Sequence, residues 1–379
     1  MSNTWRLLVD DGVGAAEGLA LDEALMAHYA RGCPARPPTL RLYTYRSHCA
    51  LVGRYQHLEA EVDLEACRQT GTHVNRRPTG GGAILMGEDQ LGVALVMRAP
   101  PEHPQELLRR LSQGIVAGLR RLGIHAAFGG KNDLQVGTRK IAGLGIYLDG
   151  HGALLFHASV LADLDIPFML RVLRIPAAKL GDKGVEAVAH RVTTVTERTS
   201  THWTGAALRV VVAQGYAEAF GVSLSPAEPE PSERERAARL EREKYRTAQW
   251  VDQLRPQPDL TGSALVKTPA GLLRVYLSLV GSTIKSAMIV GDFNEFPEEL
   301  ARFEAALKWS RLERGELRRI ASRILSGRPL GTSAEQLVEA VLQAGERARA
   351  RQASLPLRQE GSCYFPEVKE HAADRTGPV

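Results

Sequence analysis

The residues best suited to chemistry form one short run, RRPTGGGAIL at positions 76–85. Three consecutive glycines remove every Cβ, so their backbone N–H groups can approach an anion or a planar ring closely. The two preceding arginines carry fixed positive charge and can donate paired hydrogen bonds to a phosphate. The run therefore predicts an anion-binding loop. The glycines alone leave open a tight turn beside two surface arginines, because glycine-rich loops are common.

A second run, KNDLQVGTRKIAG at positions 131–143, places Lys140 on the far side of a turn. A lysine that emerges there onto a concave face can neutralise a phosphate or polarise a carbonyl. Further along, His157 stands on an otherwise apolar strand. Taken singly, a solvated lysine and a hydrogen-bonded core histidine are the simpler interpretations. A functional interpretation of these residues therefore depends on their combination.

Several common chemistries lack their sequence signals. The chain has no GxxxxGK[ST] loop, no GxGxxG after a strand, no HExxH and no GxSxG, so P-loop, dinucleotide, zincin and hydrolase interpretations are not supported. The four cysteines, which form no CxxC pair and no Cys/His cluster with metal-ligand spacing, are Cys33, Cys49, Cys67 and Cys363. We therefore expect neither a zinc site nor a disulfide framework, and a cytoplasmic location.

Composition indicates a globular chain that requires neither nucleic acid nor a membrane. Of its 379 residues, 44% are hydrophobic and 24% are charged. The formal net charge is only +5, because 48 Lys and Arg stand against 43 Asp and Glu. This balance favours acidic partners without requiring nucleic acid. No uninterrupted apolar run approaches the ~20 residues of a membrane span, and the first residues lack the apolar stretch of a signal peptide.

The elements that would position these residues fall into two parts. The first has strand patterns at 39–44, 91–96 and 153–161, helical spacing over 107–122 and a hairpin over 134–148. This irregular order favours an α+β domain over a doubly wound sheet. The second part has strands at 263–267, 272–279 and 283–290, followed by helical spacing at 298–309, at 315–325 and after a Ser333–Gln336 cap.

Prolines and a mixed-charge run separate the two parts. In that run, Ser232 and Glu235 have capping-box spacing, which predicts the start of a solvated helix. We predict a catalytic domain at 1–224, a charged proline-rich linker at 225–244, a smaller domain at 245–350 and a flexible tail at 351–379.

The order of these segments resembles one family, the lipoate-protein ligases of the biotin/lipoate ligase catalytic-domain superfamily. The resemblance runs from LALDEAL at 19–25 and LVGRYQ at 51–56, through RRxxGGG at 76–82, to the Asn132-Asp133 pair, KIAG at 140–143 and the His157 strand. These segments, in this order and spacing, make the resemblance specific, and it covers about two thirds of the chain. Residues 262–325, with IVGDF at 289–293, resemble the accessory domain that some ligases carry fused.

The resemblance implies a class II synthetase-like α+β catalytic domain, a smaller α+β accessory domain and a two-step reaction. Lipoate attacks the α-phosphate of Mg-ATP to give lipoyl-adenylate and pyrophosphate, and a lysine of an acceptor protein then takes the lipoyl group as an amide. Lys140 would be catalytic, since a cation held between carboxylate and phosphate offsets their repulsion. Asp133 would contact Mg²⁺. Carried over by position, the ATP contacts are Arg77, Gly80, Gly81, Gly82, Ala83, Ile84, Leu85 and Lys140, and the lipoate contacts are Lys140, Gly81, Arg54 and His157.

Two departures from the family pattern affect the acyl pocket and the metal site. Family members commonly show a His-Asp pair four residues after the glycines, where this chain has MGED at 86–89. Asp89 is the candidate to replace the missing carboxylate. Ala142 stands where a serine or cysteine is frequent, and we expect little loss from so small a replacement.

Other functions of the same superfamily need other residues. An octanoyl or lipoyl transferase works without ATP through a low-pKa cysteine that precedes the lysine, and there is none between Gly123 and Gly143. A biotin ligase would need a Gly-Arg-Gly-Arg type of loop, which is absent. A non-catalytic lipoate-binding protein is favoured only by the missing His-Asp pair. The resemblance suggests as acceptor a lipoyl domain of a 2-oxoacid dehydrogenase, glycine-cleavage H protein or a lipoate-binding protein of sulfur oxidation.

Overall fold

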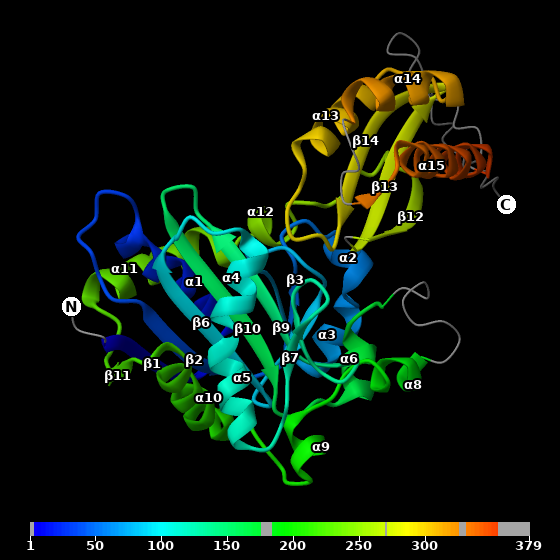
Figure 1. Cartoon of the computed structure of the whole chain (residues 1–379). Coiled ribbons are helices and arrows are strands. Elements are labelled where there is room, and N and C mark those ends of the chain that lie inside the picture. Colours follow the sequence, from blue (N-terminus) through cyan, green and yellow to red (C-terminus); the bar gives the residue numbers. More distant parts are fainter. Residues whose placement is uncertain (1–3, 176–183, 270, 326–330, 355–379) are drawn as a thin grey trace, which may run out of the picture.

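The computed structural model describes residues 4–175, 184–269, 271–325 and 331–354 (Figure 1). Two sheets lie within residues 4–226, which we call the first part, and a third lies within residues 262–291 of the second part. Of the tail expected at 351–379, only the first residues fall in the described part, where they end a helix. The rest of that tail lies outside the described residues.

A large mixed sheet forms the framework of the first part. Its strands are β1 (Thr4–Val13), β2 (Thr39–Tyr45), β6 (Gln90–Arg98), β7 (Ala127–Gly129), β8 (Asp133–Val136), β9 (Arg139–Leu148), β10 (Ala153–Leu161) and β11 (Ser223–Pro226). The spatial order is β11-β1-β2-β6-β10-β9-β8-β7. β1 pairs in parallel with β2 and β11, whereas the other neighbours are antiparallel. This mixed order confirms the predicted α+β class.

A second, small sheet carries the glycine run. Its strands are β3 (Cys49–Val52), β4 (His73–Arg76) and β5 (Ile84–Met86). β3 is central, parallel to β4 and antiparallel to β5. The run RRxxGGG therefore joins the two outer strands and crosses the end of β3.

Helices cover both faces of the large sheet, with α1 (Ala15–Met26) on one face and α4 (Pro104–Leu111), α5 (Gln113–Arg121) and α10 (Gly205–Phe220) on the other. Three further helices, α2 (Leu58–Glu61), α3 (Leu64–Thr70) and α6 (Ile166–Val172), pack on the small sheet. The remaining short helices of this part are η1 (Ala27–Tyr29), α8 (Gly184–Ala189) and α9 (Val195–Thr199). Side chains of β2 alternate, so that Leu40 and Leu42 pack in the core under α4, α5 and α10, while Tyr43 and Tyr45 pack in the core under α1. The helical spacing predicted over 107–122 is confirmed by α4 and α5. The helix is interrupted at Ser112, whose hydroxyl donates to the Arg109 carbonyl at 3.0 Å.

The charged segment after β11 packs on the first part of the chain. It contains α11 (Pro231–Leu240), η3 (Glu241–Tyr245) and α12 (Ala248–Val251). The capping box expected from Ser232 and Glu235 is wrong, because the helix begins earlier with proline in its first turn. Glu233 instead accepts from the Glu230 N–H at 2.7 Å.

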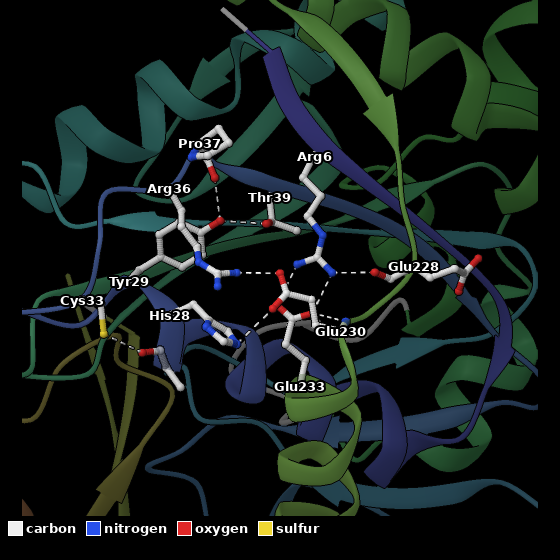
Figure 2. Close-up of polar contacts among 11 residues, drawn as sticks. Arg6, His28, Tyr29, Cys33, Arg36, Pro37, Thr39, Glu228, Glu230 and Glu233 are labelled. Atoms are coloured by element: carbon white, nitrogen blue, oxygen red, sulfur yellow. Dashed lines mark hydrogen bonds and ion pairs between the residues drawn. The ribbon is translucent and has the colours of Figure 1, made fainter. Parts of the chain in front are cut away.

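An ion-pair network holds α11 in place (Figure 2). The buried Glu233 carboxylate binds the Arg6 guanidinium at 2.6 Å, and Arg36 binds Glu230 at 2.6 Å. Ligand atoms of His28, Glu230 and Glu233 lie within 4.8 Å of one another. Because two guanidinium groups already occupy these carboxylates, the cluster is a structural ion-pair network and no candidate for a cation.

The second part is a three-stranded meander covered by helices. Its elements are β12 (Gly262–Thr268), β13 (Gly271–Val280), β14 (Thr283–Gly291), α13 (Glu298–Leu307), α14 (Arg314–Ile324) and α15 (Ala334–Ser354). Both strand pairs are antiparallel, which confirms the predicted meander. Apolar residues of the sheet and the three helices form a separate core. The predicted cap is also confirmed, since Ser333 and Gln336 bond reciprocally at 2.9 and 3.2 Å.

Contacts between the parts centre on the turn after β3. The Tyr55 carbonyl accepts from the Gly291 N–H at 2.8 Å, and the Tyr55 ring stacks on Phe293 at 5.6 Å between centroids. Nearby, Arg274 pairs with Glu61 at 3.2 Å. These contacts place the loop that follows β14 against the glycine run.

Candidate active site

A cavity of 450 Å³ lies where the two parts meet. Its walls are the glycine run, the β8–β9 hairpin, β10 and two segments of the second part, around the β12–β13 turn and after β14. The lining residues are Arg77, Gly80, Gly81, Gly82, Ala83, Ile84, Lys131, Asn132, Asp133, Lys140, Gly143, Leu144, His157, Ser159, Lys267, Thr268, Pro269, Gly271, Leu272, Asp292 and Asn294. The lysines and the glycine run suit this cavity to an anionic ligand.

Glycine is needed in this run because the backbone has a positive φ at one position and because neighbouring carbonyl groups leave no room for a Cβ at others. Gly81 has φ +88°, a conformation that L side chains rarely adopt, and its N–H donates to the Phe293 carbonyl at 3.1 Å. A Cβ on Gly80 would overlap the same carbonyl, and one on Gly53 would overlap the Gly81 carbonyl. The glycine run is therefore a packed loop between β3 and the second part.

Arg77 holds the glycine run by hydrogen bonds to its carbonyl groups. Its guanidinium is buried and donates to the carbonyls of Leu51 at 2.8 Å, Gly80 at 2.9 Å and Gly82 at 2.6 Å. Burial lowers the pKa of Arg77 to about 10. Binding both flanking carbonyls fixes the loop while leaving Arg77 on the cavity wall.

Arg76 has a different task, facing away from the cavity. Its buried guanidinium donates to the carbonyls of Gly53 at 2.9 Å, Gln56 at 2.7 Å and Val251 at 2.9 Å. The Trp250 indole N–H donates to the Arg76 carbonyl at 2.8 Å. Burial lowers the pKa of Arg76 to about 10. Arg76 therefore ties the turn after β3 to the end of the segment that connects the two parts.

Lys140 projects from the start of β9 and pairs with Asp133 across the hairpin at 2.7 Å. Its backbone is held from outside, because its N–H donates to the Arg191 carbonyl at 2.8 Å. A Cβ on Gly143 would lie 2.9 Å from the Lys140 Nζ. The glycine of the KIAG run thus leaves room for the ammonium group over the cavity.

His157 is half-buried on β10, and its imidazole is neutral. Burial, together with the charge of Arg77, lowers its pKa to about 3. Its Nε2 lies 2.7 Å from the Thr79 hydroxyl at the start of the glycines. A Cβ on Gly145 would overlap the imidazole, so the strand next to β10 makes space for it. His157 therefore positions the loop and lines the cavity without carrying charge.

A second, mainly apolar cavity continues the first inward. It has a volume of only 20 Å³ and shares Arg77, Ile84, His157 and Ser159 with the larger cavity. The rest of its lining is Leu19, Asp22, Tyr43, Tyr45, Leu51, Pro78, Thr79, Met86, Leu155 and Ala158. At its wall, the buried Asp22 accepts from the Arg41 guanidinium at 2.6 Å and from the Tyr43 hydroxyl at 3.1 Å. Such a narrow, mostly apolar extension suits an acyl chain.

Most residues that the sequence singled out come together here. Those that line the main cavity are Arg77, Gly80, Gly81, Gly82, Ala83, Ile84, Asp133, Lys140 and His157. Two lie elsewhere: Leu85 packs in the core beneath α2 and α6, and Arg54 lies over the rings of Tyr55 and Tyr147. Asp89, the candidate replacement carboxylate, lines neither cavity, whereas Met86 of the same run lines the inner one.

Sequence reasoning missed the contribution of the second part. Lys267, Asp292 and Asn294 follow the glycine run by about two hundred residues and yet line the same cavity. The one available signal was the IVGDF run, which ends just before Asn294. The inner cavity was missed as well, although Asp22 lies in the LALDEAL run.

None of the cysteines among the described residues lines either cavity. Burial raises the pKa of Cys49 to about 12 and that of Cys67 to about 11, where the nearby Asp63 adds to the effect. Neither is a ready nucleophile, because reactivity follows the thiolate. Cys363 lies outside the described residues.

The fold and the site are those of one family of enzymes. Residues 14–217 match the lipoyl protein ligase A/B catalytic domain, and the chain belongs to this family of lipoate ligases and transferases. Octanoyltransferase LipM from Symbiobacterium thermophilum is 31% identical over 274 residues, which cover 66% of this chain and 98% of the relative. LipM from Kyrpidia tusciae is 31% identical over 273 residues, 65% of this chain and 98% of the relative.

Solved structures with the same fold include ligases. A bipartite lipoate protein ligase from Thermoplasma acidophilum, solved in a study that includes its E2 lipoyl domain, has a TM-score of 0.60 at 27% identity and covers 68% of this chain and 100% of its own. Lipoate-protein ligase A bound with ATP has a TM-score of 0.57 at 26% identity and covers 66% and 98%. Plasmodium falciparum LipL1 in complex with lipoate shares the fold over 89% of this chain and 99% of its own, with a TM-score of 0.65 at 15% identity. None of the helices in the described ranges is long and apolar enough to cross a membrane.

Proposed function

We propose that this chain is an ATP-dependent lipoate-protein ligase, which activates lipoate as lipoyl-adenylate and transfers the lipoyl group to a lysine of an acceptor protein. The observation that carries the proposal is the lining of the main cavity: a glycine loop and lysines face it, and none of the described cysteines does. Cations and backbone amides are what a nucleotide needs, whereas a transferase needs a thiolate. The ligase A structure with bound ATP supports the same conclusion.

Lys140 acts in the first step by placing positive charge between two anions. Asp133 holds its ammonium at 2.7 Å, at the edge of the main cavity. There the ammonium bridges the lipoate carboxylate and the α-phosphate, offsets their repulsion and stabilises the negative charge that develops as they join. The inner cavity would take the acyl chain, and its side chains must move apart because only 20 Å³ is open.

Magnesium enters as part of the MgATP substrate. Asp133 and Asp292 both line the cavity and supply carboxylate oxygen, the donor that Mg²⁺ prefers. These residues fit the ion, which would neutralise phosphate charge when bound. We propose a lipoyl domain, H protein or sulfur-oxidation lipoate-binding protein as acceptor, and the cytoplasm as the place of reaction.

An ATP-independent octanoyl or lipoyl transferase is the second candidate, and the LipM relatives favour it. Such an enzyme would form a thioester on one of its own cysteines. Cys49 and Cys67 are poorly suited, because they are buried with raised pKa values. The ligase is therefore our first proposal.

The two candidates differ in their acyl donor, and this difference provides the test. Purified full-length protein and an acceptor lipoyl domain are incubated either with ATP, Mg²⁺ and lipoate or with an octanoyl-carrier-protein thioester. We expect acyl transfer to the acceptor, detected by intact-protein mass, only with the first mixture. Modification from the thioester without ATP would instead establish the transferase.

A further inference from the structure

The second part of the chain brings a lysine into the active-site cavity. Lys267 is exposed near the end of β12 and lines the same cavity as the glycine loop and Lys140. Unlike Lys140, it has no ion-pair partner within the described part of the chain. A lysine that lines a cavity without a carboxylate partner is available to bind an anionic ligand.

The first part of the chain contributes another lysine to this cavity. Lys131 precedes β8 and lines the cavity too. Burial lowers its pKa, while the charge of Asp292 opposes this effect. Asp292 itself comes from the loop after β14 and accepts a hydrogen bond from the Leu272 backbone N–H. The cavity thus has cations on walls that belong to both parts of the chain.

Forming an adenylate needs positive charge in two places. As a lipoate carboxylate oxygen bonds to the α-phosphorus, the bond between that phosphorus and the oxygen bridging to the β-phosphate breaks, and its electron pair leaves on pyrophosphate. Lys140 has been assigned to the attacking side, where carboxylate and α-phosphate meet. The leaving pyrophosphate needs its own cations, since charge develops there in the transition state.

We propose that Lys267 and Lys131 bind the β- and γ-phosphates of ATP from opposite sides of the domain boundary and stabilise the leaving pyrophosphate. This inference rests on the ATP-dependent function proposed above. It assigns to the second part a direct contact with substrate in the first step. Acyl transfer to the acceptor releases AMP and involves no pyrophosphate, so it does not need these lysines.

The docked position of the second part is what makes Lys267 available. The Gly81 N–H donates to the Phe293 carbonyl at 3.1 Å, and the Tyr55 carbonyl accepts from Gly291 at 2.8 Å. The turn after Lys267 is ordered by Thr268, whose hydroxyl accepts from the Gly271 N–H at 3.1 Å and donates to the Gly271 carbonyl at 2.9 Å. Nucleotide binding and domain docking would therefore stabilise each other.

The test uses full-length Lys267→Ala and two reactions. Lipoate-dependent exchange of labelled pyrophosphate into ATP reports the first step, and transfer from supplied lipoyl-adenylate to an acceptor lipoyl domain reports the second. We expect exchange to fall by about 100-fold, the loss typical of removing one group that stabilises transition-state charge, with transfer unchanged. Lys267→Arg should recover most of the exchange, because it keeps the cation.

A matched control is Lys308→Ala, which removes an exposed lysine of the same part that lines no described cavity and has no described ion pair. It should leave both reactions unchanged. Exchange by Lys267→Ala at the rate of this control would overturn the proposal, and so would an equal loss of exchange and transfer, which would indicate a structural role. Absence of exchange in the unmodified protein would instead overturn the proposed function, and this inference with it.

Discussion

Replacing Lys140 with alanine should lower the rate of adenylate formation while leaving the free energy of unfolding almost unchanged. Lys140 and Asp133 are about one third exposed, with side-chain exposures of 33% and 27%, so their ion pair is screened by solvent. Breaking such a pair should change the free energy of unfolding by only about 0–1 kcal/mol. In the reaction the same ammonium faces developing charge, and its loss should raise the barrier by roughly 3 kcal/mol, which is about 150-fold in rate.

The assay is lipoate-dependent pyrophosphate exchange, with urea unfolding of the same protein as the stability measurement. Asp133→Asn is the comparison variant, since it leaves the lysine charge and keeps an oxygen that can contact Mg²⁺, and we expect a smaller loss of exchange. Near-normal exchange by Lys140→Ala would remove this residue from the mechanism. A large loss of unfolding free energy would show that the pair holds the hairpin and would refute the assignment to chemistry.

Three further changes have outcomes set by the structure. Gly81→Val places a β-branched residue at φ +88° beside the Arg77 guanidinium. Calorimetry should then show a loss of ATP affinity of at least about 10-fold, and unchanged affinity would indicate that the glycine run is a simple turn. The pKa of His157 is about 3 in the folded chain and 6.5 in the unfolded chain. Between these values only the unfolded chain binds the proton, so the free energy of unfolding falls as the pH is lowered from 6.5 toward 3. His157→Gln should therefore flatten the acid side of the stability profile, and an unaltered slope would contradict the neutral histidine. A chain that ends at residue 240 lacks the buried Tyr245 and the Val251 carbonyl that accepts from Arg76. Thermal unfolding should show this chain to be less stable than one that ends at residue 256, by about 3 kcal/mol or more, and equal stability would contradict the packing described here.

Local patterns predicted much of the framework, for reasons visible in single elements. β2, β6 and β10 were predicted from side-chain alternation, and in each strand alternate side chains pack in one core or the other. The start of α11 was misplaced because the helix begins at Pro231, with a capping box between Glu230 and Glu233, and is not capped by Ser232. The interruption at Ser112 was not predicted, because the apolar spacing continues from α4 into α5 while the helix does not.

The site was predictable only where its residues share a run. The glycines and Arg77 are adjacent in sequence, and Lys140 belongs to a hairpin, so their types and spacing indicate chemistry. Lys267 reaches the cavity because the second part docks on the first through contacts such as that of Gly291 with Tyr55, which no local pattern encodes. Arg76 and Arg77 look equivalent in sequence, and only the acceptors around each, Val251 for one and Gly82 for the other, show that their tasks differ.

The most direct test of ligase chemistry is pyrophosphate exchange by a full-length chain without cysteine. Cys33 and Cys363 are replaced by serine, and the buried Cys49 and Cys67 by alanine, with thermal unfolding to verify that the protein is folded. A ligase has no covalent enzyme intermediate, so we predict lipoate-dependent exchange within about 3-fold of the unmodified protein, a change of less than ~1 kcal/mol in barrier. A folded cysteine-free protein that loses acyl transfer, while the unmodified protein works without ATP, would contradict the account and establish a thioester mechanism.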